Sequence, residues 1–259
     1  MMNTEQRSER SSRDPVTGAQ QLIEIADLRF SWPKSSQPVL DIERLSIPAR
    51  ESLFLIGPSG SGKSTLLSIL SGIIKPQDGS VQVLGKDLAE MNSSGRDKFR
   101  ADHIGYIFQQ FNLIPYLSVI DNVTLPCRFS AQRTQKARTK SGSPSREAKR
   151  LLAHLGLSAE QFAGKPVVEL SVGQQQRVAA ARALIGEPEL VIADEPTSSL
   201  DPDHRAAFIK TLFSECERNS STLVFVSHDH TLQKYFDRTL SITELNGTAV
   251  SSMCGEVTS

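Results

Sequence analysis

Short apolar runs divide the first part of the chain into strand-like segments, separated by turns that contain proline or glycine. Strands are expected near residues 22–30, 40–47, 52–56 and 80–84. After the third of these a helix is expected, because apolar residues recur there at helical spacing and form a stripe that can pack on a sheet. The stripe consists of Leu66, Leu67, Ile69, Leu70, Ile73 and Ile74.

The rest of the chain alternates between apolar runs and amphipathic stretches. The apolar runs predict buried strands at 104–108, 190–193 and 223–226, and two short strands are expected to close the chain. Helices are expected at about 173–186 and 203–218. Alternating strands and helices predict an α/β protein with a mostly parallel sheet wrapped by helices.

The composition shifts between about residues 111 and 170, where we expect an inserted helical subdomain. The segment from Gln132 to Arg150 carries seven lysines and arginines, and Glu147 is its only acid. Such a run of charge is usually a solvated face, so we interpret it as the outer surface of the insert. Contact with lipid headgroups or with a partner is the alternative.

Overall composition excludes several classes of function. Lysine plus arginine and aspartate plus glutamate number 29 each, which gives no charge imbalance typical of a nucleic-acid binder. The cysteines Cys127, Cys216 and Cys254 are far apart in the sequence, which predicts reduced thiols of a cytosolic protein and no metal site.

No apolar run approaches the roughly 20 residues that span a bilayer. Residues 1–20 are polar and lack the apolar core of a signal peptide, so we expect a disordered tail there. We expect a second tail at residues 251–259. Any membrane role is therefore expected to come through a partner.

A complete phosphate-loop motif, G-x-x-x-x-G-K-[ST], follows the apolar run 53–56 and precedes the predicted helix. Its glycines let backbone N–H groups point at phosphate oxygens, and the helix directs its positive end at the same anion. The chain is therefore expected to bind a nucleoside triphosphate, and a plain Gly/Ser turn is the alternative. The motif consists of Gly57, Pro58, Ser59, Gly60, Ser61, Gly62, Lys63, Ser64 and Thr65.

Two acids, Asp194 and Glu195, end the buried strand 190–193. An acid at the end of a strand beside a phosphate loop can hold Mg²⁺. Glu195 faces the other way if the chain stays extended, and it can then polarise the water that attacks the γ-phosphate. The alternative is that the pair only caps the helix near residue 203.

Further motifs, in the same order as in a known family, narrow the prediction. Residues 170–177, Leu-Ser-Val-Gly-Gln-Gln-Gln-Arg, resemble the signature of ATP-binding cassette (ABC) ATPases. Gln109 matches the Q-loop glutamine of that family, 198–201 match its D-loop, and His228 matches its switch histidine. The resemblance covers about residues 21–250. Trp32 stands where the family places an aromatic that stacks on adenine, with Phe30 as the second candidate.

The resemblance implies a P-loop NTPase of the ABC type over about residues 21–250. Its fold has a mainly parallel sheet core, an N-terminal antiparallel β subdomain and the inserted helical subdomain at about 111–170. It also implies ATP and Mg²⁺ as cofactors. Each nucleotide is held between the phosphate loop of one subunit and the signature of another, so we expect a head-to-tail homodimer unless the chain pairs with a different ATPase.

The residue roles carried over from the family fall into two sets. In the subunit whose phosphate loop holds the nucleotide, which is the near side of the site, Lys63 neutralises phosphate charge, while Ser64, Gln109 and Asp194 surround Mg²⁺. Gln109 also links the site to the helical insert.

For catalysis, the resemblance implies Glu195 as general base and His228 as the group that holds the γ-phosphate and the attacking water. From across the interface, Ser171 donates to the γ-phosphate and Asp201 bridges the subunits. Gly173 and Gln174 complete the nucleotide-binding set.

One residue departs from the family pattern. Val172 stands where the signature usually has glycine. Valine keeps the backbone N–H but is incompatible with positive φ, so a left-handed conformation there would be strained. Ser171 and Gly173 are retained, and we expect a working ATPase.

The type of ABC protein follows from what the chain carries. No heptads separate Lys63 from Ser171, which excludes relatives that handle DNA ends, and a single cassette excludes the translation type. The chain resembles the ATPase subunit of a transporter, peripheral on the cytoplasmic side of the inner membrane and bound to integral-membrane permease subunits. Residues 100–115 and 121–126 resemble the lipoprotein-releasing and macrolide-export group. A polar amino-acid importer ATPase is the runner-up, and a regulatory ATPase without a transport partner is a further alternative.

Overall fold

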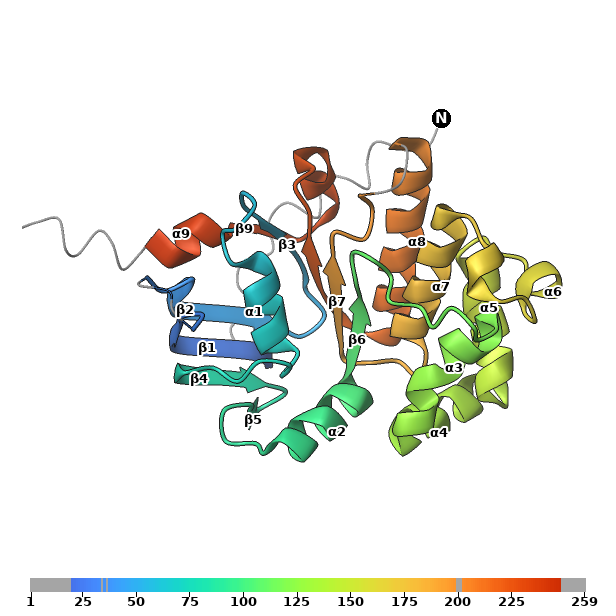
Figure 1. Cartoon of the computed structure of the whole chain (residues 1–259), viewed down its shortest axis with the longest axis horizontal. Coiled ribbons are helices and arrows are strands. Elements are labelled where there is room, and N and C mark those ends of the chain that lie inside the picture. Colours follow the sequence, from blue (N-terminus) through green and yellow to red (C-terminus); the bar gives the residue numbers. More distant parts are fainter. Residues whose placement is uncertain (1–19, 34, 36, 199–201, 248–259) are drawn as a thin grey trace, which may run out of the picture.

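Two sheets of different kind form the framework of the computed structural model, which describes residues 20–33, 35, 37–198 and 202–247. The first sheet is antiparallel and has the strand order β2-β1-β4-β5 (Figure 1). The second has the order β6-β7-β8-β3-β9, and every pairing in it is parallel. The antiparallel strands are β1 (Gln21–Phe30), β2 (Leu40–Pro48), β4 (Asp78–Val83) and β5 (Lys86–Asp87). The parallel strands are β3 (Ser52–Ile56), β6 (Ile104–Ile107), β7 (Leu190–Asp194), β8 (Thr222–Val226) and β9 (Arg238–Ser241).

Apolar cores cover both faces of the parallel sheet, which explains why the sequences of its central strands are continuous apolar runs. Successive side chains of a strand point to opposite faces, so neighbours such as Leu53 and Phe54 enter different cores. One core joins this sheet to the antiparallel sheet and to α1 (Lys63–Leu70). The other joins it to α7 (Val172–Leu184) and α8 (Pro202–Asn219). Helices α1 and α7 therefore cover opposite faces of the parallel sheet.

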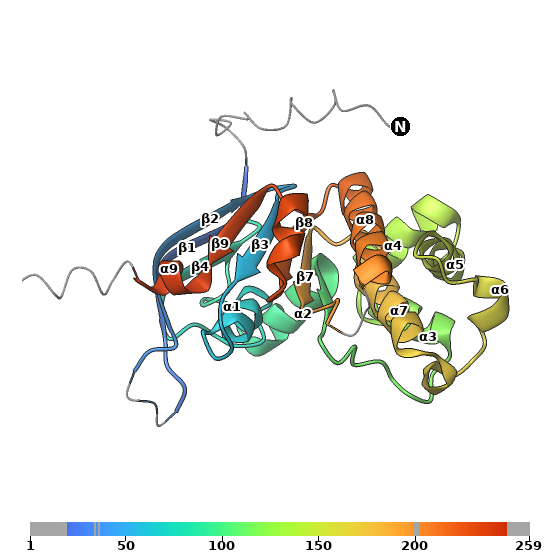
Figure 2. The same ribbon diagram turned by 90° about the horizontal axis from the view of Figure 1, so that it is seen from above.

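The helical insert lies at the far end of the molecule from the antiparallel sheet, with the parallel sheet between them (Figure 2). Serine N-caps begin its three long helices, since the hydroxyls of Ser118, Ser130 and Ser143 each accept a backbone N–H of the first turn. Its helices are α3 (Val119–Phe129), α4 (Ala131–Ser141), α5 (Pro144–His154) and α6 (Ala159–Phe162), followed by the 3₁₀ turn η2 (Val167–Glu169).

The structure departs from the predicted elements at two places. The sequence analysis missed helix α2 (Ser93–His103), which is strongly polar and carries only Phe99 and Asp102 as buried residues. It also predicted two closing strands, whereas β9 is followed by helix α9 (Ile242–Gly247), which packs against β2. Ile242 of α9 is fully buried in the core that contains α1. Between β8 and β9 the chain forms a 3₁₀ helix, η3 (His230–Tyr235). Except for Gln20, the expected tails lie outside the described residues, as does Asp201.

The prediction of a solvated outer face for the basic segment is wrong for four of its seven cations. Arg133 is 2% exposed, and three others pair with acids. Only Arg138, Arg146 and Lys149 are exposed. Three of the four acids come from outside the segment, which a run of charge does not reveal. The pairs are Lys136 with Glu189, Lys140 with Glu187, and Arg150 with Glu147 and Glu215.

The ion pairs with Glu187, Glu189 and Glu215 fasten the insert to the core. The pKa of Glu189 is about 2; burial raises it, but hydrogen bonds from His103 and Lys136 outweigh that effect. Glu189 precedes β7, while His103 ends α2 and Lys136 lies on α4, so one carboxylate joins three elements.

In the described part of the chain, every helix is too short or too polar to span a bilayer.

Gly105 marks the closest approach of β6 to α7. A Cβ built there would lie 2.2 Å from the carbonyl oxygen of Ala183. We expect Gly105→Ala to lower the free energy of unfolding by about 2 kcal/mol, because backbone atoms would have to move apart. Chemical denaturation measures this change. Gly164→Ala is the control, since a Cβ at Gly164 meets open space, and equal stability of the two variants would contradict the expectation.

Candidate nucleotide site

The phosphate loop joins the end of β3 to the start of α1. Gly60 and Gly62 have φ values of 80° and 98°, which other residues rarely adopt. Gly62 is the N-cap of α1 and provides no side-chain cap, so the first N–H groups of the helix remain available to an anion. Nζ of Lys63 lies 2.7 Å from the carbonyl oxygen of Gly57 and 2.8 Å from that of Pro58. The loop thus carries a cation and backbone donors at one point.

A hollow of about 490 Å³ adjoins this loop and is lined by Gly60, Ser61 and residues of the β1–β2 connection and α9. Asn246 of α9 organises it: its amide donates to the carbonyl of Val39 at 3.1 Å and accepts the N–H of Asp41 at 3.1 Å. Helix α9 also backs the loop, because a Cβ at Gly57 would lie 2.3 Å from Cγ2 of Ile242. This supporting role of α9 was not predicted.

Oxygen ligands for a cation meet beside the loop. Ser64, the second residue of α1, has its hydroxyl near enough to Asp194, at the end of β7, to lower the pKa of that carboxylate. Burial raises the pKa of Asp194 above its ordinary value, Glu195 adds to that rise, and Ser64 and Lys63 oppose it. A hydroxyl and a carboxylate suit Mg²⁺, which binds through one or two protein oxygens together with phosphate oxygens. The described residues contain no larger cluster of histidine, cysteine or acid side chains that could hold a metal.

Glu195 and His228 form a pair at the ends of adjacent strands. Oε2 of Glu195 lies 2.9 Å from Nδ1 of His228, whose side chain is 74% exposed, against 14% for Glu195. The strands β7 and β8 are aligned so that Asp194 pairs with Val226, which brings the following residues together.

The expectation that Glu195 continues an extended strand is wrong. Its φ is +48°, a left-handed value, and β7 ends one residue earlier. The N–H of Glu195 donates to the carbonyl of Val226 at 3.0 Å, and its carbonyl accepts the N–H of Ser198 at 3.2 Å. This turn, not strand alternation, directs the carboxylate toward His228.

Gln109 and Trp32 are the two more distant predicted residues on the same chain. Gln109 is exposed and lies two residues after β6, the neighbour of β7, so it follows the same edge of the sheet as Asp194. Trp32 follows β1 and is 46% exposed, with its ring edge-to-face against Phe30 at 5.2 Å between centroids. Phe30 is only 5% exposed, which leaves Trp32 as the aromatic face available for stacking.

The signature begins helix α7. Ser171 is its N-cap in a reciprocal capping box: the Ser171 hydroxyl accepts the N–H of Gln174, and Oε1 of Gln174 accepts the N–H of Ser171 at 2.9 Å. Val172 is the first helical residue and is absent from the left-handed region. The strain considered for valine therefore does not arise. Gly173 is partly exposed in the same first turn.

One chain does not unite all of the predicted residues. Helices α1 and α7 cover opposite faces of the parallel sheet, and Figure 2 shows the start of α7 beside the helical insert. Ser171, Gly173 and Gln174 therefore lie apart from the phosphate loop of their own chain. Asp201 falls outside the described residues.

The sequence analysis missed Arg182, a buried arginine on α7. It donates to the carbonyls of Phe111 and Asn112 at 2.5 and 2.6 Å, two residues with φ of 59° and 48°. Burial lowers the pKa of Arg182 to about 10. Arg182 thus fixes the turn that follows Gln109. A lone arginine within the apolar stretch 178–185 was the available signal.

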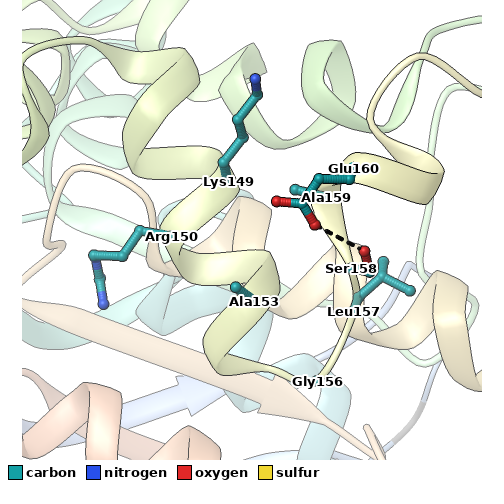
Figure 3. Close-up of a pocket in the computed structure, with 8 residues that line it drawn as sticks. All are labelled: Lys149, Arg150, Ala153, Gly156, Leu157, Ser158, Ala159 and Glu160. Carbon is teal, nitrogen blue, oxygen red and sulfur yellow. Dashed lines mark hydrogen bonds between the residues drawn. The ribbon is translucent and has the colours of Figure 1, made fainter.

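A second hollow, of about 410 Å³, lies on the helical insert and contains none of the predicted site residues (Figure 3). Glu160 accepts a hydrogen bond from the Ser158 hydroxyl there at 3.0 Å, while the side chain of Arg150 extends toward Glu215. We exclude this hollow from the candidate site.

Comparisons with known proteins find a matching family model and similar relatives. A family model described as "ABC transporter" matches residues 40–198. The lipoprotein-releasing system ATP-binding protein LolD of Hyphomonas neptunium is 37% identical over 84% of this chain and 92% of its own length. The macrolide export ATP-binding/permease protein MacB of Burkholderia thailandensis is 36% identical over 87% of this chain and 33% of its own.

A solved structure is also similar. The ATP-binding cassette MJ0796, described as a dimer in a post-hydrolysis state bound to ADP and Pi, superposes with a TM-score of 0.74 at 32% identity. The match covers 85% of this chain and 93% of that one. The expected fold class is thereby confirmed.

Val172→Gly tests whether valine restrains the signature. Because Val172 has ordinary helical geometry, the change relieves no strain. Glycine in a helix costs up to about 1 kcal/mol. We expect a slightly lower melting temperature and a turnover of ATP within threefold of the wild type, measured by phosphate release. A rise of more than tenfold would show instead that the valine acts as a brake.

Proposed function

The chain belongs to the ABC transporter family and is an ATPase and ATP-binding subunit of that kind; on this premise we propose that it drives a separate permease of the lipoprotein-releasing or macrolide-export type. The resemblance to LolD and MacB supports that choice, and so does the amino-acid sequence of residues 100–115 and 121–126. The proposed unit is one ATP-binding domain over about residues 21–250, with a helical subdomain at about 111–170. It would lie peripherally on the cytoplasmic side of the inner membrane.

The near side of each site would bind the phosphates of ATP. The loop amides and Lys63 neutralise their charge, and Lys63 exchanges its carbonyl partners Gly57 and Pro58 for phosphate oxygens. Ser64 and Asp194 would hold Mg²⁺, with Gln109 nearby at the same sheet edge. When bound, Mg²⁺ offsets the negative charge of the phosphate groups. Trp32 would stack on the adenine.

The pair of Glu195 and His228 carries the proposal of hydrolysis in this chain. Glu195 follows β7 and His228 follows β8, the strand between β7 and β3, and the two side chains lie 2.9 Å apart. Glu195 accepts a proton from the attacking water as general base. Nδ1 of His228 is directed to Glu195, which orients the ring and leaves Nε2 available to the γ-phosphate.

The far side of each site would come from a second copy, because the signature and the phosphate loop lie on opposite faces of the sheet. The dimeric state of MJ0796 supports this. The hydroxyl of Ser171 accepts the N–H of Gln174, so its own hydrogen is directed outward as a donor. The N–H groups of Val172 and Gly173 add donors at the helix N-terminus. Asp201 would bridge the two subunits.

Such an arrangement makes ATP bind more tightly to the closed dimer than to separated subunits. Cleavage of the γ-phosphate removes the group that both subunits hold, and the preference disappears. A ligand shifts a conformational equilibrium by its difference in affinity for the two states. The cycle of closing and opening is therefore able to move a permease attached to the cassettes.

The permease would dock near the segment that follows Gln109. Tyr116 in this segment is 80% exposed. The backbone bridge between Ser118 and Pro166 joins the segment to the residues that precede the signature, where Val168 is 62% exposed. A short amphipathic helix of the permease fits such an exposed apolar surface.

Glu195→Gln tests the assignment of the base. The amide cannot accept the proton of water but keeps the size of the side chain. We expect ATP binding and an ATP-dependent dimer in size-exclusion chromatography, with phosphate release at least about 100-fold slower. Glu160→Gln, remote from the site, serves as control. Phosphate release from Glu195→Gln at the wild-type rate would overturn the assignment.

Tyr116→Ala tests the docking surface. The tagged chain is expressed with the permease encoded beside it, and its share in the membrane fraction is measured. We expect this share to fall at least fivefold in the variant, with ATP hydrolysis by the purified chain unchanged. Phe129→Ala is the matched control, because Phe129 is also an exposed aromatic (70%) but ends α3.

Equal recovery of both variants in the membrane fraction would contradict this docking surface. If the wild type itself stays out of the membrane fraction, the proposed role in a transporter fails. The better interpretation is then a regulatory ATPase without a transport partner.

A further inference from the structure

Gln176 is a fully buried polar side chain on the signature helix α7, with 0% exposure. Its Nε2 donates a hydrogen bond to the carbonyl of Pro196. Pro196 directly follows Glu195, the proposed base. One side chain thus joins the helix that begins with the signature to the turn that carries the base.

The orientation of this amide follows from its partner. A carbonyl only accepts hydrogen bonds, so Nε2 must face Pro196 and Oε1 must point away. Within the described part of the chain, Oε1 of Gln176 has no hydrogen-bond partner. A buried acceptor without a partner costs stability. Folding therefore gains little from this amide, and its distinctive contribution is the link to Pro196.

The link bears on the direction of Glu195. The turn at 195–198 is held by Val226 on one side, through the Glu195 N–H, and is closed by the N–H of Ser198 on the Glu195 carbonyl. Glu195 itself has the unfavourable φ of +48°. The bond from Gln176 fixes the next residue of this turn from the α7 side, so a movement of α7 is transmitted to the backbone that aims the carboxylate.

We propose that Gln176 is a positioning residue that couples the two ATP sites of the dimer. The proposal rests on the head-to-tail arrangement of the proposed function. In that arrangement the signature of a chain contacts the ATP held by its partner, whereas Glu195 acts on the ATP of its own phosphate loop. Gln176 connects these two parts within one chain. Engagement of one nucleotide by the signature therefore aligns the base at the other.

The neighbouring Gln175 provides a matched control. It lies on the same helix turn, is partly buried, and its Nε2 donates to the carbonyl of Leu170 at 3.0 Å. It has the same chemistry as Gln176 but its hydrogen bond stays within the signature segment. Loss of this bond leaves the turn at Glu195 untouched.

The test compares Gln176→Met with Gln175→Met in the full chain. Methionine keeps the length of glutamine, and at position 176 it exchanges one unpaired acceptor, Oε1, for another, the Pro196 carbonyl. The melting temperature is therefore expected to stay within a few degrees of the wild type. ATPase rates are measured as a function of ATP concentration, and binding of a fluorescent ATP analogue is measured separately.

For Gln176→Met we expect a fall in kcat of about tenfold and a Hill coefficient that drops from above 1.5 to about 1, with analogue affinity within twofold of the wild type. Gln175→Met, which loses a bond within the signature segment only, is expected to keep a Hill coefficient above 1.5. The proposal is overturned if the wild type has a Hill coefficient of 1, or if Gln176→Met and Gln175→Met do not differ in Hill coefficient. It is also overturned if Gln176→Met loses activity only by unfolding.

Failure of the proposed function gives a different result. In that case Glu195→Gln forms no ATP-dependent dimer, or the wild type does not hydrolyse ATP. An ATP-dependent dimer together with unchanged kinetics of Gln176→Met rejects the coupling role alone.

Discussion

The parallel alignment of β6, β7, β8 and β3 is the constraint on which the candidate site depends. Parallel strands end at the same edge of a sheet, so the residues that follow them meet although they are distant in sequence. Asp194 is the last residue of β7, and Gln109, His228 and the phosphate loop follow β6, β8 and β3. The two apolar cores hold this register, because a shift by one residue would exchange the side chains that enter the two cores and disturb the packing of both.

The same sheet also separates the site into two halves. It places the phosphate loop and α1 on one face and α7 with the signature on the other. A phosphate held by the loop therefore cannot be reached by the signature of the same chain. This separation is the physical reason why we propose a site shared between two copies.

Helix α7 connects the parts that such an assembly needs to coordinate. Its N-terminus carries the signature, Gln176 contacts the turn after Glu195, and Arg182 holds the turn after Gln109. Most of the helix is buried in the core beneath the insert. The ion pairs of Glu189 and Glu215 fasten the remaining insert to the core. Hydrogen bonds and charges, several of them buried, thus tie the insert to the core.

The sequence by itself determined the fold class, most strands and the identity of the chemical groups, because apolar periodicity and local motifs are properties of short segments. Tertiary structure decided features that need contacts between distant segments. Only the fold shows that Glu195 lies in a left-handed turn against Val226, that the basic cations at 133–150 meet Glu187, Glu189 and Glu215, and that α9 ends the described chain as a helix. Local pattern has no information on such partners, since each is supplied by a segment far along the chain.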